Sequence, residues 1–374
     1  MLIASLAAFV FSNQFHVVKL AFNFWNPVSI SQYRLSRLSD EEYTSAIEQA
    51  LEDGDISDAQ MMVEIAEENN RGLPAELIQR TQESTVEFGL RNTWDFLNGS
   101  ITGEVTSTAS LGGVLAADYV GIGDARDVIV QGSRMVKGDT YDQLTLGLAL
   151  AGLATVVPGS GPADLGFSVL KTASKAGKMP KKLVGHLNST AGALIDTDGL
   201  KRGLSRVSLP ELKMPSINAV RTSFRDIDWR GVTKGDFAQL KKPISTMFPV
   251  DTGAIKDAFS SALRKDALEE ISILADSATG IISAGGVKSG LRALEYADDA
   301  KDLSRFHSLA AHMGERTSAI IKILGKSAIK LGELLYLVIV MLVAALGWLL
   351  GAVWLSISTF RTMYSAIKLA KRYS

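Results

Sequence analysis

The sequence places a serine three residues before a lysine at Ser168/Lys171, Ser327/Lys330 and Ser365/Lys368. A desolvated lysine can remove the proton of such a serine, and one class of serine hydrolases uses this pairing. The partner motifs of those enzymes are absent, and pairs of this kind arise by chance in a chain with 39 Lys and Arg residues. We therefore predict no catalytic residue. Ser168 with Lys171 is the pair that an unrecognised hydrolase would use.

Two other motifs are incomplete. Residues 53–58 with Glu64 mimic the spacing of a calcium-binding loop, but Asp58 occupies the position that needs glycine for a sharp turn. Residues 325–327 read Gly-Lys-Ser, like the end of a phosphate-binding loop, but the glycine required five residues before them is Ile320. We predict a turn with a helix cap at the first motif and a helix at the second.

The sequence offers no set of residues for a metal site. The four histidines are His16, His186, His307 and His312. The last two are five residues apart, which puts them on different faces of a helix, whereas a zinc-binding helix uses a spacing of four. The absence of cysteine excludes disulfides, thiolate metal sites and cysteine nucleophiles. We predict neither a metal nor a cofactor.

The longest apolar stretch, Leu334–Phe360, has no charged side chain. A bilayer core about 30 Å thick needs roughly 20 apolar residues of helix. The fourteen Leu, Ile and Val residues of the stretch favour insertion by about 4–8 kcal/mol. A buried helix of a soluble protein usually has a polar flank over this length. The stretch is therefore predicted to be a transmembrane helix in contact with membrane lipid.

Particular side chains along this stretch suggest how it meets its surroundings. The predicted membrane-interface residues are Tyr336, Trp354, Phe360 and Tyr364, which lie near the two boundaries as an aromatic belt would. Gly347 and Gly351 form a GxxxG spacing that lets a second helix approach closely. We predict helix packing at these two glycines, through self-association or with a protein partner.

The orientation of the span is not decided by charge. Four basic residues precede it (Arg316, Lys322, Lys326 and Lys330) and four follow it (Arg361, Lys368, Lys371 and Arg372). The tail 361–374 has no acidic residue and, as a helix, would separate apolar from basic side chains in the manner of a helix lying on a membrane surface. We predict a cytoplasmic tail.

Two further segments are apolar. Residues 1–28 lack a basic region and a clear cleavage site, and Lys19 interrupts them, so we expect an uncleaved N-terminal anchor. An interfacial helix, or a start codon placed too far upstream, is the alternative. Leu144–Val157 is too short to cross a bilayer before Pro158 breaks it. Residues 144–170 are predicted to form an apolar hairpin, either buried in a protein core or inserted shallowly into lipid.

Charge is distributed unevenly along the chain. Residues 1–150 contain 21 Asp and Glu against 9 Lys and Arg, a net charge of −12, and the remainder has a net charge of +11. Such polarity is typical of a surface for anionic lipid or nucleic acid, or of two halves that dock on one another. Solvated faces that partly neutralise each other are the simplest alternative. No aromatic interleaving or recognised module supports nucleic acid, so no nucleic-acid partner is predicted.

The periodicity of apolar residues predicts an all-α protein, with a helical extramembrane region and a C-terminal transmembrane helix. Ser39 or Asp40 should cap a helix to about Glu52, and Asp124 should cap a helix to Lys137. A third helix of the acidic region is expected from about Ala75 to Phe96. The predicted regions are 1–28 (apolar segment), 39–100 (acidic helical hairpin region), 101–177 (apolar helices with a Gly/Pro-broken hairpin), 178–250 (basic, Pro-containing arm), 251–330 (helical region), 331–360 (transmembrane helix) and 361–374 (basic tail).

Residues 116–178 resemble the segment that precedes the toxin domain in many bacterial polymorphic toxins. In that segment an Asp-rich turn leads to a helix, an apolar stretch and a Gly/Pro break. The matching residues here are Asp118, Gly123, Asp124, Gly152, Pro158, Gly159 and Gly161. No nuclease or deaminase follows them. The whole chain is also similar to a group of uncharacterised proteobacterial membrane proteins, which implies a bacterial setting.

These observations lead to one hypothesis and two alternatives. We predict a non-enzymatic protein of the bacterial inner membrane, whose helical part lies mainly in the periplasm and serves interaction or scaffolding. The first alternative is a toxin-related, membrane-active protein that inserts the apolar hairpin 144–170. The second is an unrecognised membrane-anchored hydrolase.

Overall fold

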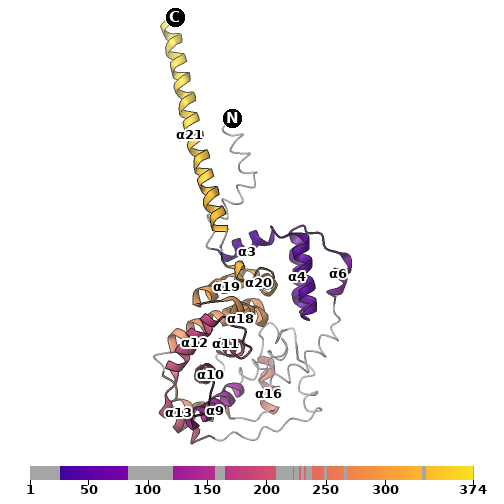
Figure 1. Cartoon of the computed structure of the whole chain (residues 1–374), viewed down its shortest axis with the longest axis vertical. Coiled ribbons are helices and arrows are strands. Elements are labelled where there is room, and N and C mark those ends of the chain that lie inside the picture. Colours follow the sequence, from indigo (N-terminus) through magenta and orange to yellow (C-terminus); the bar gives the residue numbers. More distant parts are fainter. Residues whose placement is uncertain are drawn as a thin grey trace.

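The computed structural model describes residues 26–82, 121–155, 165–207, 222, 227–228, 231–232, 238–247, 251–264, 268–330 and 334–373. Within these residues the regular structure is helical, and the one extended pairing is an isolated bridge between Ile195 and Leu263. The all-α prediction is confirmed. Figure 1 shows a bundle of helices from which one long helix, α21 (Leu334–Tyr373), extends. The predicted N-terminal anchor at 1–28 lies almost entirely outside the described residues.

The N-terminal part of the bundle contains α3 (Pro27–Leu35), α4 (Asp40–Glu52), α5 (Ile56–Glu68) and α6 (Ala75–Arg80). Ser39 caps α4 as predicted: its hydroxyl accepts from the Glu42 amide at 3.2 Å, and the Glu42 carboxylate accepts from the Ser39 amide at 2.7 Å. The buried Tyr43 donates to the Leu35 carbonyl at 2.9 Å, and burial raises the pKa of Tyr43 to about 12, so the phenol stays neutral. The expected third helix ends at Arg80, well short of Phe96, and residues 83–120 lie outside the description.

The middle of the chain forms α9 (Ile122–Lys137), α10 (Gln143–Thr155), α11 (Leu165–Lys175), α12 (Lys181–Leu194) and α13 (Thr197–Leu204). Every residue of α10 from Leu144 to Leu153 is buried, because α9, α11 and α12 pack around it. Of the two alternatives for the apolar segment 144–170, burial in a protein core is therefore the one that holds for α10. The predicted basic arm at 178–250 is wrong for residues 181–204, where α12 and α13 pack on the body through Leu183, Leu187 and Leu200, each fully buried.

The C-terminal part contains α16 (Lys241–Met247), α17 (Thr252–Phe259), α18 (Leu268–Tyr296), α19 (Ala300–Met313) and α20 (Arg316–Leu324), with 3-10 turns η2 (Ala238–Leu240) and η4 (Gly325–Ala328). Within the predicted helical region 251–330, Gly314, with φ of 58°, separates α19 from α20. Another glycine, Gly286 with φ of 82°, kinks α18, since this backbone conformation is costly for other residues.

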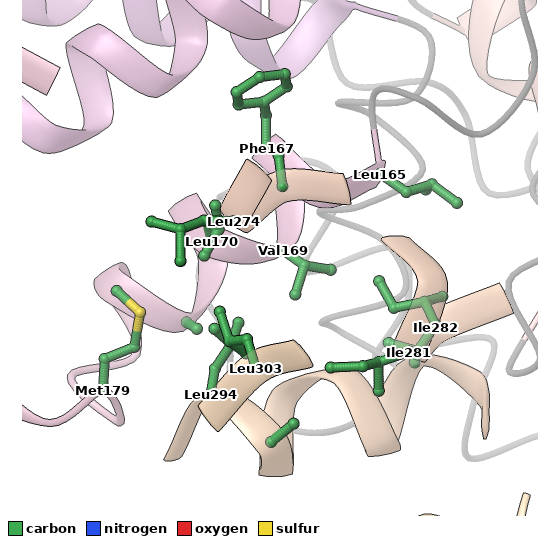
Figure 2. Close-up of a cluster of buried hydrophobic side chains, with 14 of the residues drawn as sticks. Leu165, Phe167, Val169, Leu170, Met179, Leu274, Ile281, Ile282, Leu294 and Leu303 are labelled. Carbon is green, nitrogen blue, oxygen red and sulfur yellow. The ribbon is translucent and has the colours of Figure 1, made fainter. Parts of the chain in front are cut away.

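The hydrophobic core joins these parts. Figure 2 shows Leu165, Phe167, Val169 and Leu170 of α11 among side chains of α18, with Leu303 of α19 nearby. A close approach between the two helix backbones makes this packing possible. A Cβ atom on Gly166 would lie 2.0 Å from the Ala275 carbonyl oxygen, so only glycine fits there. Consequently α10 and α11 are fixed to α18, and the bundle has a continuous core.

Candidate membrane anchor and buried charge clusters

The helix α21 differs from every other described helix in its exposure. It contains 40 residues, which corresponds to a length of about 60 Å. Its stretch Leu342–Ser365 is long and apolar enough to cross a membrane, and none of it is buried against the rest of the protein. Figure 1 shows α21 leaving the bundle beside α3, α19 and α20. The predicted apolar span therefore forms a single helix, and the described part of the chain builds no core around its stretch Leu342–Ser365.

The predicted interface and packing residues of α21 lie on this exposed helix. Trp354, Phe360 and Tyr364 are 70%, 74% and 66% exposed. The side chain of Tyr336 lies outside the described ones. A Cβ atom on Gly347 or Gly351 would meet nothing within 4 Å. The predicted packing at these two glycines therefore stays a prediction, and the helix offers the open surface that it needs.

The helix α21 continues through the predicted basic tail as far as Tyr373. Its second half contains several hydroxyl side chains, which would be costly in hydrocarbon without hydrogen-bond partners. They donate to carbonyl oxygens four residues earlier: Ser356 to Ala352 at 2.8 Å, Thr359 to Leu355 at 2.7 Å, Thr362 to Ser358 at 3.0 Å and Ser365 to Arg361 at 2.8 Å. Hydrogen bonding within the helix makes these residues compatible with a lipid environment.

The helical body contains a buried charge cluster centred on Lys171 of α11. The side chain of Lys171 is 1% exposed, and its Nζ lies 2.5 Å from Asp124 Oδ1 and 3.0 Å from Asp127 Oδ2, both on α9. Lys175 Nζ lies 2.7 Å from the same oxygen of Asp127, and Arg126 Nη2 lies 3.1 Å from the other. We call these five residues the Lys171 cluster. It joins α9 to α11 through charges that are removed from water.

The local sequence explains how the Lys171 cluster is assembled. Asp124 and Asp127 are three residues apart, and Lys171 and Lys175 are four apart, so each pair shares one face of its helix. Gly152 of α10 makes room for the cluster, since a Cβ atom there would lie 2.3 Å from Asp124 Oδ2. The predicted capping role of Asp124 is wrong: the residue lies inside α9, whose N-cap is Gly121.

The electrostatics of the cluster argue against the hydrolase hypothesis. Burial raises the pKa of Asp127, but the Lys171, Arg126 and Lys175 cations outweigh burial and hold this pKa well below its usual range. The Lys171 amine is bound to the carboxylates of Asp124 and Asp127, at 2.5 and 3.0 Å. Ser168 is itself buried, at 1% exposure. The pair is thus placed to stabilise the fold.

A second cluster, the Asp55 cluster, lies at the motif 53–58, where we predicted a turn with a helix cap, and it joins α5 to α18 and α20. It consists of Asp53, Asp55, Asp58, Lys288, Arg292 and Lys322. Arg292 Nη2 lies 2.5 Å from Asp55 and 2.8 Å from Asp58, and Lys322 Nζ lies 2.7 Å from Asp53. Burial raises the pKa of Asp55, but Lys288, Arg292 and Lys322 together lower it below its usual range. These carboxylates therefore bind cationic side chains of the same chain. The N-cap of α5 is Asp55, whose side chain makes no capping hydrogen bond of the kind predicted at this motif.

A third cluster, the Asp302 cluster, lies near the start of α21 and contains Asp298, Asp302, Lys326 and Lys330. Lys326 binds Asp298, and both Lys326 and Lys330 lie 3.2 Å from Asp302. The predicted helix at 325–327 is instead the 3-10 turn η4, and its lysine holds the turn against the start of α19. The lysine of the Gly-Lys-Ser motif is thus bound by two aspartates of the same chain.

Two of the three clusters join the acidic and basic halves of the sequence. Acidic residues before position 150 pair with basic residues after it in the Lys171 and Asp55 clusters, and Arg316 pairs with Glu64 and Glu68. Of the alternatives for the asymmetry, docking between the two halves is the one that these contacts confirm. The helical spacing of like charges could have indicated that charged faces exist on these helices. Nothing in the sequence indicates which acidic residue pairs with which basic residue.

No group of three or more His, Asp and Glu side chains suited to a metal ion occurs in the described part of the chain. His307 and His312 both lie on α19, where His312 Nδ1 contacts the Ser308 carbonyl at 2.8 Å. Comparison with protein-family models, curated proteins and solved structures finds no match. The resemblance of residues 116–178 to a pre-toxin segment consequently stays a prediction, although Asp124 and Gly152, two of the residues on which it rests, lie in contact.

Proposed function

We propose that the protein is a membrane-anchored helical scaffold, held in the bilayer by α21 and acting through interaction rather than catalysis. The observation that carries the proposal is the exposure of α21. Leu350, Trp354 and Phe360 are at least 70% exposed, whereas the body buries its own large apolar residues in a continuous core. Apolar surface of this extent is unfavourable in water and favourable in hydrocarbon.

The pairing of charged side chains in the body supports a non-catalytic role. The side chains best suited to acid–base chemistry are Lys171 and the aspartates of the three clusters. Each of them forms ion pairs across a helix interface within its own cluster. A rigid body of this kind suits presentation of a surface at a membrane. The sequence resemblance supports a bacterial setting, and the composition of the tail supports a cytoplasmic C-terminus. We propose the inner membrane, with the body in the periplasm, as part of this setting.

The proposal can be tested through lipid contact of α21 itself. The sequence has no cysteine, so a fluorophore attached at Leu349→Cys reports on one position. In vesicles containing brominated phosphatidylcholine, the fluorescence of the full-length protein should be quenched, because Leu349 lies midway along the apolar span. Persistent fluorescence, together with a monodisperse protein in detergent-free buffer, would contradict the proposal.

A matched pair of variants separates insertion from general folding. Leu346→Arg with Leu350→Arg adds about 5–7 kcal/mol at the centre of the span, which offsets the drive for insertion, so quenching at position 349 should be lost. The control, Val136→Arg with Ile273→Arg, makes the same kind of exchange at two exposed apolar residues of the body and should leave quenching unchanged. Equal quenching in both double variants would show that α21 does not enter the lipid.

A further inference from the structure

The end of the body next to α21 has a fixed relation to that helix. Only three residues separate Lys330 from Leu334, so their Cα atoms are at most about 14 Å apart. The headgroup layer is about 5–8 Å thick on each side of the hydrocarbon. If the apolar part of α21 enters the hydrocarbon near Leu334, Lys330 must lie within or next to the headgroups. This step rests on the proposed function of α21.

The helix α3 is tied to the same place. Arg34 Nη2 donates to the Lys330 carbonyl at 3.2 Å, and α3 packs on α19, α20 and η4. Figure 1 shows α3 on the side of the body from which α21 leaves. Its buried residues, Pro27, Ile30, Ser31 and Leu35, are directed towards the body. The opposite side of α3 is therefore turned outward, near the start of α21.

The outward side of α3 has the composition of an interfacial surface. Gln32, Ser36 and Arg37 are exposed, and the Arg37 guanidinium lies over the Tyr33 ring, 5.5 Å from its centre. Residues 26–38 include two arginines and no acid, and the next acids, Asp40 to Glu42, form the first turn of α4. Tyrosine and arginine are side chains that bind well at the boundary between water and lipid.

From this juxtaposition we propose that the outward face of α3, with Tyr33 and Arg37, lies against the headgroups of anionic phospholipids in the bilayer that α21 spans. Arg34, which is bound to the Lys330 carbonyl, adds positive charge beside this face. Headgroup phosphates accept hydrogen bonds from guanidinium groups, and the ring of Tyr33 can lie at headgroup level. The contact would hold the body at a defined orientation to the membrane, where the link to α21 alone would leave it free to tilt.

Fluorescence quenching at the headgroup level tests this proposal on the full-length protein. A fluorophore at Gln32→Cys, in vesicles of phosphatidylglycerol and phosphatidylcholine in equal parts with a headgroup spin label, should be strongly quenched. The same fluorophore at Asp139→Cys, which follows α9 at the far end of the body, should retain its fluorescence. Equal fluorescence at the two positions would overturn the proposal.

The contribution of charge can be measured with one further pair of variants. Arg37→Gln should shift the equilibrium between the membrane-apposed and free orientations by about fivefold, as expected for loss of one basic residue at an anionic surface. Arg134→Gln, at an exposed position of α9, removes the same charge far from α3 and should leave quenching at position 32 unchanged. Equal shifts from both variants, or no shift from Arg37→Gln, would contradict the role of Arg37.

The fluorophore at Leu349→Cys distinguishes failure of this proposal from failure of the anchor. If position 349 is quenched by brominated lipid while position 32 is not quenched at the headgroups, α21 is inserted and α3 does not touch the membrane. If position 349 is not quenched, the proposed anchoring fails and the α3 proposal fails with it.

Discussion

The helices α10 and α21 are both apolar, yet one lies at the centre of the protein and the other outside it. The residues of α10 from Leu144 to Leu153 are buried among α9, α11 and α12, whereas none of the described residues forms a core around the Leu342–Ser365 stretch of α21. Length separates the two cases. The 13 residues of α10 extend about 20 Å, which a helical bundle can enclose, whereas α21 is three times longer. The length of an apolar helix, and the number of neighbouring helices that can cover it, therefore decide whether a protein core can enclose it.

The neighbours of α10 depend on the Lys171 cluster, and breaking it should give the largest effect. Lys171→Met leaves Asp124 and Asp127 buried without their principal cation, so we expect the free energy of unfolding of the body to fall by about 3–5 kcal/mol. Chemical denaturation followed by circular dichroism would measure this loss. Lys175→Met, whose side chain is 22% exposed, is the control and should cost less. Equal losses for the two variants would show that burial of the charge is not what matters.

Truncation of one leucine in each apolar helix tests the comparison directly. Leu148→Ala in α10 removes a fully buried side chain and should lower the free energy of unfolding by about 2–5 kcal/mol. Leu349→Ala in α21, where the side chain is 53% exposed, should change the unfolding of the body by less than about 0.5 kcal/mol. A similar loss of stability for the two variants would mean that α21 has a protein core in solution.

Acid should weaken the body through the carboxylates that hold its helices together. The folded-state pKa values of Asp127 and Asp55 are lowered, so the stability that they contribute is present above their unfolded pKa of about 3.9 and is lost as the pH falls towards the folded value. We expect the free energy of unfolding to decrease steeply below about pH 4. Asp127→Asn should flatten this dependence, and a slope that is unchanged in this variant would contradict the assignment.

Removal of the cap on α4 should have the smallest effect. Ser39→Ala removes the hydroxyl that accepts from the Glu42 amide and should cost about 1 kcal/mol. Ser39→Asp keeps an acceptor at the N-cap and should restore most of this stability. Thermal unfolding of the two variants would measure the difference, and equal stability would show that the cap contributes little.

The sequence was sufficient for features that depend on neighbouring residues. The cap at Ser39 and the apolar helix after Leu334 follow from local spacing and length, whereas the sequence left open whether α10 lies in a protein core or in lipid. The charge clusters could not be predicted, because Arg292 and Asp55 are 237 positions apart and nothing local selects one partner over another. For the same reason Asp124 was interpreted as a cap, although its partner Lys171 lies 47 positions later.

The central claim, that α21 crosses a bilayer, is tested most directly by the sidedness of two single cysteines in the full-length protein. A membrane-impermeant maleimide is added to sealed inner-membrane vesicles that contain either Asp139→Cys in the body or Ser374→Cys at the C-terminus. Before detergent is added, we predict that the maleimide labels only one of the two positions in vesicles of a given orientation. In vesicles of the opposite orientation, it should label only the other position. Labelling of both positions on the same side would contradict the crossing.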